Sequence, residues 1–371
     1  MVIREISKQK AHDLVIGAKI LSCGGGGSEK KAIENINQVY DKGDNFTIAD
    51  LSDFNDEDHI CIIGMVGGGI TKEERELVQS LSITQKNPMR EAVKQLEDFL
   101  EVRFSAFVAT ELGPNNSIIP LMVAAQMGKI GIDGDCCGRS KPKISISTTR
   151  VAGIPIAPFS IVNQFGDIQI VKKTVNDIRG EIIAREASKI SGGVVSVARC
   201  PMTIKQAKNA VISSTFSLAM QLGQRIREVN EKGGNPLEAI KNVLPDSNLV
   251  FSGKVKEFSR IERSGFTSGN IILESVEKTK NLLKIWYQNE YLLSWLNGEY
   301  YITCPDGFYI IDPQTGYGLT PWEEDFFEER EVVVFTKDAP KIWQSKKGLD
   351  VFGPQVFNRK WSAYRKASSF D

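Results

Sequence analysis

The part of the sequence that decides the fold is residues 104–135, FSAFVATELGPNNSIIPLMVAAQMGKIGIDGD. It begins with the β-rich run FSAFVATEL, continues through the long apolar run NSIIPLMVAAQMG, and ends in a second β-rich run, KIGIDGD. A strand, a helix and a strand in this order form the unit from which parallel sheets are built, because the connecting helix packs on the sheet. These residues therefore predict a parallel sheet covered by helices.

The residues before this unit show the same alternation of helical and strand patterns. The run HICIIGMV at 59–66 is apolar almost throughout, as expected of a strand that is buried on both faces. We therefore predict an α/β domain over residues 1–160, with a largely parallel sheet and covering helices. The predicted elements are helices at 6–21, at 29–42 after the N-cap Ser28, and from Pro88 onward, and strands at 46–51 and 59–66.

The pattern changes near Pro155. Between residues 250 and 345, short β-rich runs are separated by Gly, Asn, Asp and Pro, which is typical of an antiparallel sandwich or barrel. We therefore predict that residues 161–371 form a mostly antiparallel, sandwich-like β domain with inserted helices. Its other predicted elements are a hairpin that turns at Gly166 and helices at 175–190 and 203–231.

Composition excludes several classes of protein. Lys plus Arg (46) equals Asp plus Glu (46), so the charge gives no reason to expect a nucleic-acid partner. No apolar run approaches the ~20 residues that span a membrane. The N-terminus, MVIREISKQK, lacks the apolar core of a signal peptide, and the six cysteines include no CxxC pair. We expect a cytoplasmic protein with reduced thiols. The two histidines, His12 and His59, are too few for a histidine-rich zinc site.

Four consecutive glycines, Gly24, Gly25, Gly26 and Gly27, lie between two predicted helices. Glycine is costly to order, so such a run indicates that another group comes close to the backbone. Lys30 is wrongly spaced for a Walker loop, and no strand precedes the run as in a dinucleotide fingerprint. Two interpretations stay open: a nest of N–H groups that binds an anionic or planar ligand, and a close-packed turn. We count the four glycines as candidate substrate-binding residues.

A second candidate segment is ATELGPNNS, residues 109–117. Glu111 comes at the end of an apolar strand, and Asn115 and Asn116 follow at the start of a helix. Open α/β sheets bind ligands beyond the carboxyl ends of their strands, which favours a catalytic carboxylate at Glu111 and substrate-binding amides at Asn115 and Asn116. The alternative is that the asparagines only cap the helix.

The strongest candidate segment is IGIDGDCCGRSKP, residues 130–142. Asp133 and Asp135 are two residues apart on a strand, so both carboxylates should lie on one face. Like charges this close favour one shared proton near neutral pH, or a divalent metal ion held by both. Arg139 provides a planar fork for a carboxylate or imide-like ligand. The alternative is a structural Asp–Arg pair at a turn.

The adjacent cysteines Cys136 and Cys137 add a further alternative. Cys136 is a candidate nucleophile, but a thiolate needs a nearby cation or base, and Arg139 is the only one close in sequence. Small buried residues are the other interpretation of this pair.

Taken in order, the motifs resemble those of a known family, the S-methyl thiohydantoin desulfurase family, whose genes often neighbour those of hydantoinase/oxoprolinase subunits. The resemblance covers nearly the whole chain. It rests on CGGGGS, GMVGGGITKEE, ELGPNNSIIPLMVAA, IGIDGDCCGRSKP and the late series PDGFYIID, TGYGLTP, VVVF and GPQVF.

The resemblance implies an N-terminal α/β domain and a mostly β C-terminal domain. It also implies a hydrolase-like activity on a small five-membered heterocycle of the hydantoin type, in which oxygen replaces a methylthio group and methanethiol leaves. Under this hypothesis Asp133 or Asp135 is the base or a metal ligand, and Glu111 is the second carboxylate. Arg139 and the glycines would hold the ring. This sequence departs from the family pattern at Lys143, where the family usually has an acid.

The alternative function is a non-catalytic accessory subunit of a hydantoinase/oxoprolinase-type complex. A third hypothesis is an enzyme that binds a nucleotide or sugar phosphate at the glycines. For the enzyme we expect a small-molecule substrate and a homo-oligomeric assembly, with no nucleic-acid or membrane partner.

Overall fold

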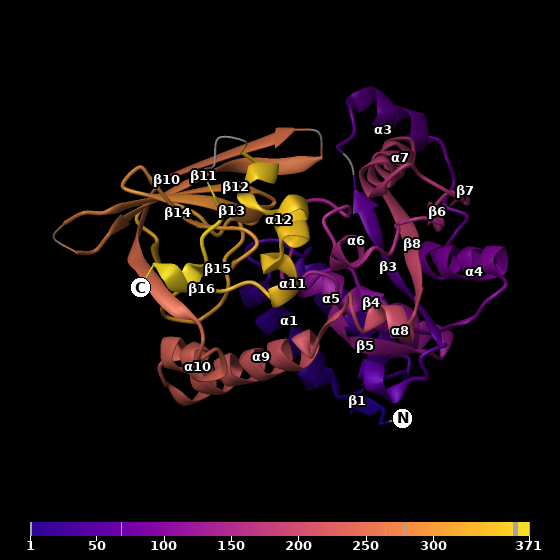
Figure 1. Ribbon diagram of the computed structural model, residues 1–371, viewed down its shortest axis with the longest axis horizontal. Helices are drawn as coiled ribbons and strands as arrows, with labels where there is room; N and C mark the ends of the chain where they lie inside the picture. The colour runs from indigo at the N-terminus through magenta and orange to yellow at the C-terminus, as the bar shows by residue number, and fades with distance from the viewer. Residues whose placement is uncertain (1, 68, 264, 278, 359–362, 371) are drawn as a thin grey trace.

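The computed structural model describes residues 2–67, 69–263, 265–277, 279–358 and 363–370, and among them two sheets organise the chain (Figure 1). Within these residues the first sheet has nine strands, in the order β1-β2-β5-β4-β3-β8-β6-β7, with β9 paired to β5. The strands are β1 (Arg4–Ile6), β2 (Phe46–Ala49), β3 (His59–Gly67), β4 (Phe104–Ala109), β5 (Ile130–Asp135), β6 (Phe159–Val162), β7 (Ile168–Val171), β8 (Val194–Thr203) and β9 (Ile212–Ser213).

The centre of this sheet is parallel, which confirms the prediction made from residues 104–135. β2 pairs with β5, β5 with β4 and β4 with β3, all in parallel. Antiparallel strands extend both edges: β1 lies beside β2, while β8 and the hairpin β6–β7 lie beyond β3. The hairpin turns at Gly166, whose φ of 100° is a conformation that favours glycine.

Helices cover both faces of the first sheet, as the sequence predicted. In β3, Cys61 and Ile63 join the core beneath α1, α2, α4 and α5, whereas Ile60 and Ile62 join the core beneath α7 and α8. The helices of this part are α1 (Lys8–Leu21), α2 (Glu29–Tyr40), α3 (Lys72–Gln79), α4 (Pro88–Leu100), α5 (Pro114–Met127), α6 (Thr148–Ala152), α7 (Asp177–Lys189) and α8 (Ile204–Ala207).

The second sheet is antiparallel throughout, as predicted, but it is a single curled sheet rather than two packed sheets or a closed barrel. In the described residues its seven strands follow the order β14-β13-β12-β11-β10-β16-β15. They are β10 (Asn248–Arg263), β11 (Phe266–Ser275), β12 (Leu282–Gln288), β13 (Glu290–Leu296), β14 (Glu299–Thr303), β15 (Gly307–Ile311) and β16 (Glu331–Lys337), followed by the helices α11 (Lys341–Gln344) and α12 (Lys346–Phe352).

The single helix predicted at 203–231 is wrong. The capping box of Thr203 and Gln206 is present, but the helix it opens, α8, ends at Ala207. The chain then pairs as β9 with the end of β5 and turns at Ser214, whose φ is 63°, before α9 (Thr215–Lys232) and α10 (Pro236–Val243) begin. A tertiary strand pairing therefore overrides the local helical pattern.

Contacts between distant segments hold the two parts of the chain together at several places. α1 packs so closely on α9 that a Cβ at Gly17 would lie 1.9 Å from the Ala219 carbonyl oxygen. A third core, which includes Cys137, Leu293 and the fully buried Trp343, joins the turn after β5 to β13 and to α11. No helix in the described ranges is both long and apolar enough to cross a membrane.

Candidate functional site

The three candidate segments of the sequence do meet at the carboxyl ends of β4 and β5. The Gly26 carbonyl oxygen accepts hydrogen bonds from the main-chain N–H groups of Asn115 (3.1 Å) and Asn116 (3.0 Å), at the start of α5. The Ser140 hydroxyl donates to the Leu112 carbonyl oxygen (2.7 Å). The glycine run, the segment after β4 and the turn after β5 are thus neighbours.

The glycine quartet is a close-packed turn. Gly24, Gly26 and Gly27 have φ between 86° and 89°, and Gly24, Gly25 and Gly26 are buried. A Cβ at Gly26 would lie 2.3 Å from the Gly113 Cα, so only glycine fits there. The quartet provides a carbonyl oxygen to the N-terminus of α5 instead of leaving that helix end open. Its contact with a ligand stays a prediction.

Glu111 lies in a buried polar group beside the quartet. Its Oε2 is 3.3 Å from the Lys141 Nζ, and both side chains are buried. Its Oε1 accepts a hydrogen bond from the Asn116 side chain (2.6 Å), whereas the Asn115 side chain accepts one from Asn35 on α2 (2.9 Å). Glu111 thus forms a buried ion pair, its catalytic role stays a prediction, and neither asparagine side chain caps α5.

Glu290, at the start of β13, faces the same group and was missed from the sequence. Its Oε1 is the atom that a Cβ at Gly25 would meet, at 2.1 Å, and its Oε2 is buried with no hydrogen-bond partner in the described structure. Burial raises the pKa of this carboxyl well above its usual value, with the negative charge of Glu111 as the next cause. In the sequence, the one signal for Glu290 is its position directly after a turn.

Asp133 is occupied by structural partners. Its Oδ1 accepts the main-chain N–H groups of Phe216 (3.1 Å) and Ser217 (3.0 Å), in the first turn of α9. Its Oδ2 accepts from the Ser217 hydroxyl (2.5 Å) and pairs with Arg4 (2.7 Å). A carboxylate at a helix N-terminus is stabilised by the exposed N–H groups there. Asp133 therefore attaches α9 to β5.

Asp135 is placed differently, although it is only two residues away. Its Oδ1 accepts the main-chain N–H groups of Cys137 and Gly138 (both 2.6 Å). Its Oδ2 is buried and has no hydrogen-bond partner among the described residues, and the same is true of the Thr215 Oγ1. Burial raises the pKa of Asp135 to about 6, although Gly138 N–H and the nearby Thr215 hydroxyl act to lower it. This carboxyl can therefore take up and release a proton near neutral pH.

Arg139 is buried, and its guanidinium bonds to main-chain oxygens across the junction between the two halves. It donates to the carbonyl oxygens of Ser140 (3.2 Å), Asp306 (2.5 Å) and Tyr291 (2.5 Å). It forms no ion pair with a described carboxylate, so its positive charge is not neutralised locally. These contacts already use most of the N–H donors of the guanidinium group. Direct binding of the substrate by Arg139 stays a prediction.

A cavity of about 810 Å³ adjoins these residues, between the turn after β5, the start of α9 and the edge of the second sheet. Thr215 and Arg139 belong to its wall, and Asp135 lies behind Thr215. Cavities with a mainly apolar lining and a few polar groups are the usual sites for small ligands. The other lining residues include Leu21, Leu112, Gly138, Leu218, Asp246, Pro305, Gly307, Tyr309, Lys337, Asp338, Pro340 and Lys341.

Thr215 was missed because the residues Ser213, Ser214 and Thr215 fell inside the predicted helix 203–231. Serine and threonine are favoured at helix N-termini, so this run was the available signal for a helix start. A helix start predicted at Thr215 would not by itself have placed this residue near the end of β5. That position depends on the pairing of β9 with β5.

Cys136 is a buried thiol. Its side chain is fully buried, and burial raises its pKa to about 12, with the negative charge of Asp135 as the next cause. It is therefore protonated at neutral pH, which is unsuitable for a nucleophile.

The acidic residues do not fit a metal site. In the described part of the chain, no group of three or more His, Cys, Asp or Glu side chains converges as metal ligands. Asp133 is occupied by Arg4 and α9, and Asp135 by the turn at Gly138, so the two carboxylates have separate partners. No chemical step below uses a metal.

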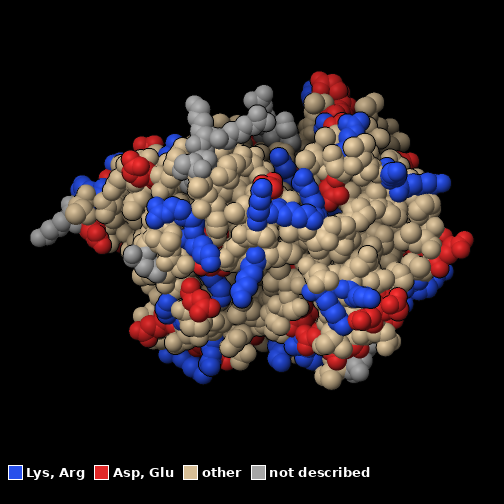
Figure 2. All heavy atoms as spheres, viewed as in Figure 1, with Lys and Arg blue, Asp and Glu red and all other residues tan. Residues whose placement is uncertain are grey.

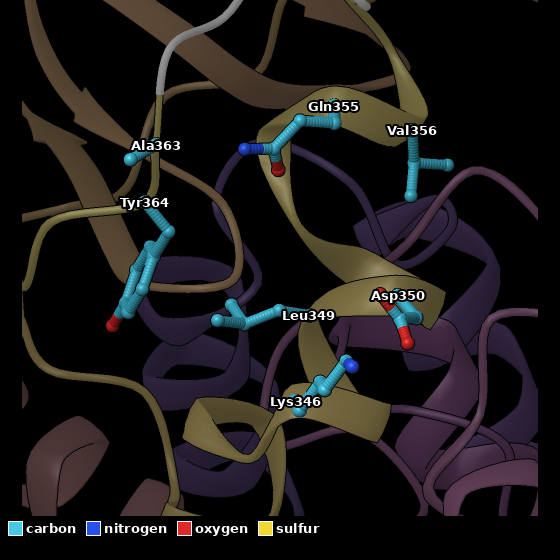
Figure 3. A pocket seen from close by; sticks show the side chains of 7 residues that line it. All are labelled: Lys346, Leu349, Asp350, Gln355, Val356, Ala363 and Tyr364. Atoms are coloured by element: carbon cyan, nitrogen blue, oxygen red, sulfur yellow. The ribbon is translucent and has the colours of Figure 1, made fainter.

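Other hollows lie elsewhere. One of about 920 Å³ is lined by Gly67, Arg185 and Phe266, among others, at the end of β3. Another, of about 780 Å³, lies beside α12, where Leu349 points toward the Tyr364 ring (Figure 3). None of the sequence-predicted site residues is among the described residues that line either hollow.

Comparison with known proteins identifies the family to which the chain belongs. Models of the S-Me-THD-like N-terminal and C-terminal domains match residues 9–173 and 175–365. A crystal structure of a Chromobacterium violaceum protein, a structural genomics target, matches with a TM-score of 0.75 and 21% identity, covering 98% of this chain and 100% of that one. This similarity shows a shared fold, and no curated protein matches. The chain therefore belongs to the S-methyl thiohydantoin desulfurase-like family.

Proposed function

We propose that the protein is a hydrolase that acts on a small five-membered heterocycle of the S-methyl thiohydantoin type and replaces its methylthio group by oxygen. The observation that carries this proposal is Asp135, a buried carboxyl with a pKa of about 6 and one unpaired oxygen, behind the wall of the cavity. Membership of the family supports the choice of substrate class.

The reaction needs a group that takes a proton from water and returns it to sulfur. In the first step the water oxygen bonds to the ring carbon that carries the sulfur, and the water proton passes to the Asp135 carboxylate. The electron pair of the C=N bond moves to the ring nitrogen. In the second step the hydroxyl proton passes to that nitrogen, the C=O bond forms and the C–S bond breaks. Methanethiolate then takes the proton from Asp135, which restores the carboxylate.

Two other residues support these steps. Arg139 provides a positive charge that is not neutralised by a described carboxylate, and in a water-poor site such a charge stabilises the negative ring nitrogen of the intermediate. Thr215 lines the cavity and its hydroxyl is close to Asp135, and we propose that this hydroxyl passes the proton between Asp135 and the substrate. We assign Asp133, Glu111 and the glycine quartet to positioning the segments around the cavity.

The direct test is product analysis with the purified chain. An S-methyl thiohydantoin incubated in water labelled with heavy oxygen should yield a hydantoin that contains one labelled oxygen, together with one equivalent of methanethiol detected by a thiol reagent. Release of methanethiol without label in the ring would contradict attack by water. Absence of both products from a folded preparation would reject the reaction.

A protein-partner role is the second candidate, and one surface feature favours it. Ile178 and Ile182 expose 48% and 42% of their surfaces and form an apolar stripe on α7, and Val175, just before the helix, exposes 91%. An accessory subunit of a hydantoinase/oxoprolinase-type complex would use such a stripe to bind its partner. Co-purification with that enzyme, lost on Ile178→Ser but with no turnover by the isolated chain, would favour this role over catalysis.

A further inference from the structure

We infer that the Tyr309 hydroxyl donates a hydrogen bond to the ring carbonyl oxygen of the substrate, and that this bond strengthens as the intermediate forms. This inference rests on the proposed function, because it names a further catalytic residue for the same reaction. It gives a role to the segment PDGFYIID, residues 305–312, which the steps above do not use.

The Tyr309 hydroxyl differs from those of other buried tyrosines. Buried tyrosine hydroxyls usually have a hydrogen-bond partner. Tyr287 donates to the Ser259 carbonyl oxygen at 2.8 Å, and Tyr291 to that of Leu319 at 2.7 Å. Tyr309, on β15, exposes only 5% of its surface and lines the cavity, but its hydroxyl forms no hydrogen bond with a residue of the described ranges. This donor is therefore available to a molecule in the cavity.

Gly307 makes room for this hydroxyl. Gly307 and Tyr309 are two residues apart on β15, so they lie on the same face of the strand. A Cβ at Gly307 would lie 2.2 Å from the Tyr309 Oη, so the hydroxyl lies against the backbone of Gly307. Gly307 also lines the cavity. The ring of Tyr309 therefore packs in the core, and its hydroxyl lies at the cavity wall.

Arg139 places a positive charge near this hydroxyl. Its guanidinium donates to the carbonyl oxygen of Asp306 (2.5 Å), the residue before Gly307. Burial raises the pKa of the Tyr309 hydroxyl above its usual value, although the charge of Arg139 acts to lower it. The phenol therefore keeps its proton at neutral pH and is a hydrogen-bond donor beside a cation.

A donor at this place suits the charge of the proposed intermediate. When water adds to the ring carbon that carries the sulfur, the electron pair of the C=N bond moves to the ring nitrogen. The ring carbonyl is bonded to that nitrogen, so part of the negative charge passes to the carbonyl oxygen. A hydrogen bond to a charged oxygen is stronger than one to a neutral oxygen, so Tyr309 stabilises the intermediate more than the substrate. Tyr309 keeps its proton throughout, so the balance of the reaction is unchanged.

Charges on the outer surface do not replace the buried donors. Figure 2 shows Lys and Arg side chains gathered in the middle of the face on which α11 and α12 lie in Figure 1. Lys341, Lys346 and Lys347 on these helices are exposed. Water and salt screen such charges, whereas a fixed donor in a buried wall acts in a medium of low dielectric constant. Stabilisation of the intermediate therefore depends on Arg139 and Tyr309.

The first test removes the hydroxyl and keeps the ring. Tyr309→Phe should lower kcat for an S-methyl thiohydantoin by about 100-fold and change KM only a few-fold, because the donor acts mainly on the intermediate. Tyr287→Phe is the matched control, since it removes one buried hydroxyl from the same sheet, outside the cavity. It should keep kcat within about twofold of the wild type. Thermal unfolding shows whether both variants are folded.

A second substrate identifies the atom that Tyr309 contacts. In this analogue a thiocarbonyl replaces the ring carbonyl, and sulfur is the weaker hydrogen-bond acceptor. The wild type should prefer the carbonyl substrate in kcat at least about tenfold more strongly than Tyr309→Phe does, because only the wild type makes this bond. Equal kcat for Tyr309→Phe and the wild type would overturn the inference and leave the reaction in place. A lower kcat with an unchanged preference would also overturn it.

Binding of hydantoin, measured by calorimetry, separates this inference from the proposed reaction. If the wild type turns over neither substrate, the reaction is rejected and the product complex decides the inference. A Kd that rises at least about fivefold in Tyr309→Phe, and stays unchanged in Tyr287→Phe, would support the contact between Tyr309 and the ring oxygen. Equal binding by the wild type and Tyr309→Phe, or no binding by either, would overturn it.

Discussion

The Asp133 carboxylate accepts the main-chain N–H group of Ser217 at 3.0 Å, and this contact fixes the first turn of α9 against β5. α9 also packs on α1, and Thr215 at the start of α9 lines the cavity. The buried Asp133 side chain therefore helps to position this part of the cavity wall. The neighbouring Asp135 has no such partner on Oδ2, and this is the oxygen that we propose to take part in the reaction.

Removal of Asp133 should destabilise the fold. Asp133→Ala leaves Arg4 and the first N–H groups of α9 without their buried partner, which should lower the free energy of unfolding by roughly 3 kcal/mol. Urea unfolding measures this change. Asp50→Ala is the control, because Asp50 also pairs with Arg4 but its side chain is 47% exposed, and it should cost less than about 1 kcal/mol. Equal effects of the two substitutions would contradict a structural role for Asp133.

The glycine quartet should tolerate no side chain at Gly26. In Gly26→Ala the new Cβ would lie 2.3 Å from the Gly113 Cα, so backbone must move in addition to the strain of a φ of 88°. Gly43→Ala has a similar φ of 82° but no atom within 4 Å, so it should cost only about 1 kcal/mol. Thermal unfolding of both variants should show a clearly larger loss for Gly26→Ala. Similar losses would mean that the quartet is not closely packed.

Cys136 should be dispensable for catalysis. Because its pKa is raised to about 12, the thiol is protonated during turnover, and Cys136→Ala should keep kcat within a few-fold of the wild type. Steady-state methanethiol release measures this. A decrease in kcat of more than about 100-fold in a folded variant would support Cys136 as the nucleophile.

Asp306 should make a contribution to stability that falls as pH rises from 4 to 6. Burial raises the pKa of this carboxyl to about 6, above its unfolded value of 3.8, so the folded state binds the proton more tightly. The contribution of Asp306 is therefore fully present below pH 4 and is lost as pH rises through 6, by roughly 3 kcal/mol at most.

Asp306→Asn checks this prediction. The difference in unfolding free energy between wild type and variant should become smaller by that amount between pH 4 and pH 7, as followed by urea unfolding at several pH values. Tyr364→Phe, which removes only the hydroxyl that donates to Asp306 at 2.6 Å, should keep the pH dependence. A pH-independent difference for Asp306→Asn would contradict the assignment.

Much of the first sheet could be predicted because its signals are local. The strand at 59–66 is apolar on both faces, and Ser28 caps α2 through the Lys31 N–H as expected. The three candidate segments do meet at the carboxyl ends of β4 and β5, where the quartet, Glu111 and the turn at Ser140 are neighbours, whereas ligand binding there stays a prediction.

The roles within that neighbourhood depend on distant residues, so the local pattern does not contain them. Asp133 and Asp135 look equivalent on their strand, and they differ because Phe216 and Ser217, more than eighty residues later, approach only one of them. The curled single sheet depends on β16 pairing with β10, a contact between strands far apart in the chain. Glu290 packs against Gly25, which lies far from it in the sequence.

The pH dependence of kcat/KM for wild type and Asp135→Asn tests the proposed role of Asp135 most directly. With the carboxylate as base, wild-type kcat/KM for an S-methyl thiohydantoin should rise with pH through about 6 and then level off. For Asp135→Asn, shown to be folded by thermal unfolding, kcat/KM should be lower by roughly 100-fold or more, and its pH profile should lack this inflection. A variant that keeps the wild-type rate and the inflection near pH 6 would contradict the assignment of Asp135 as the catalytic base.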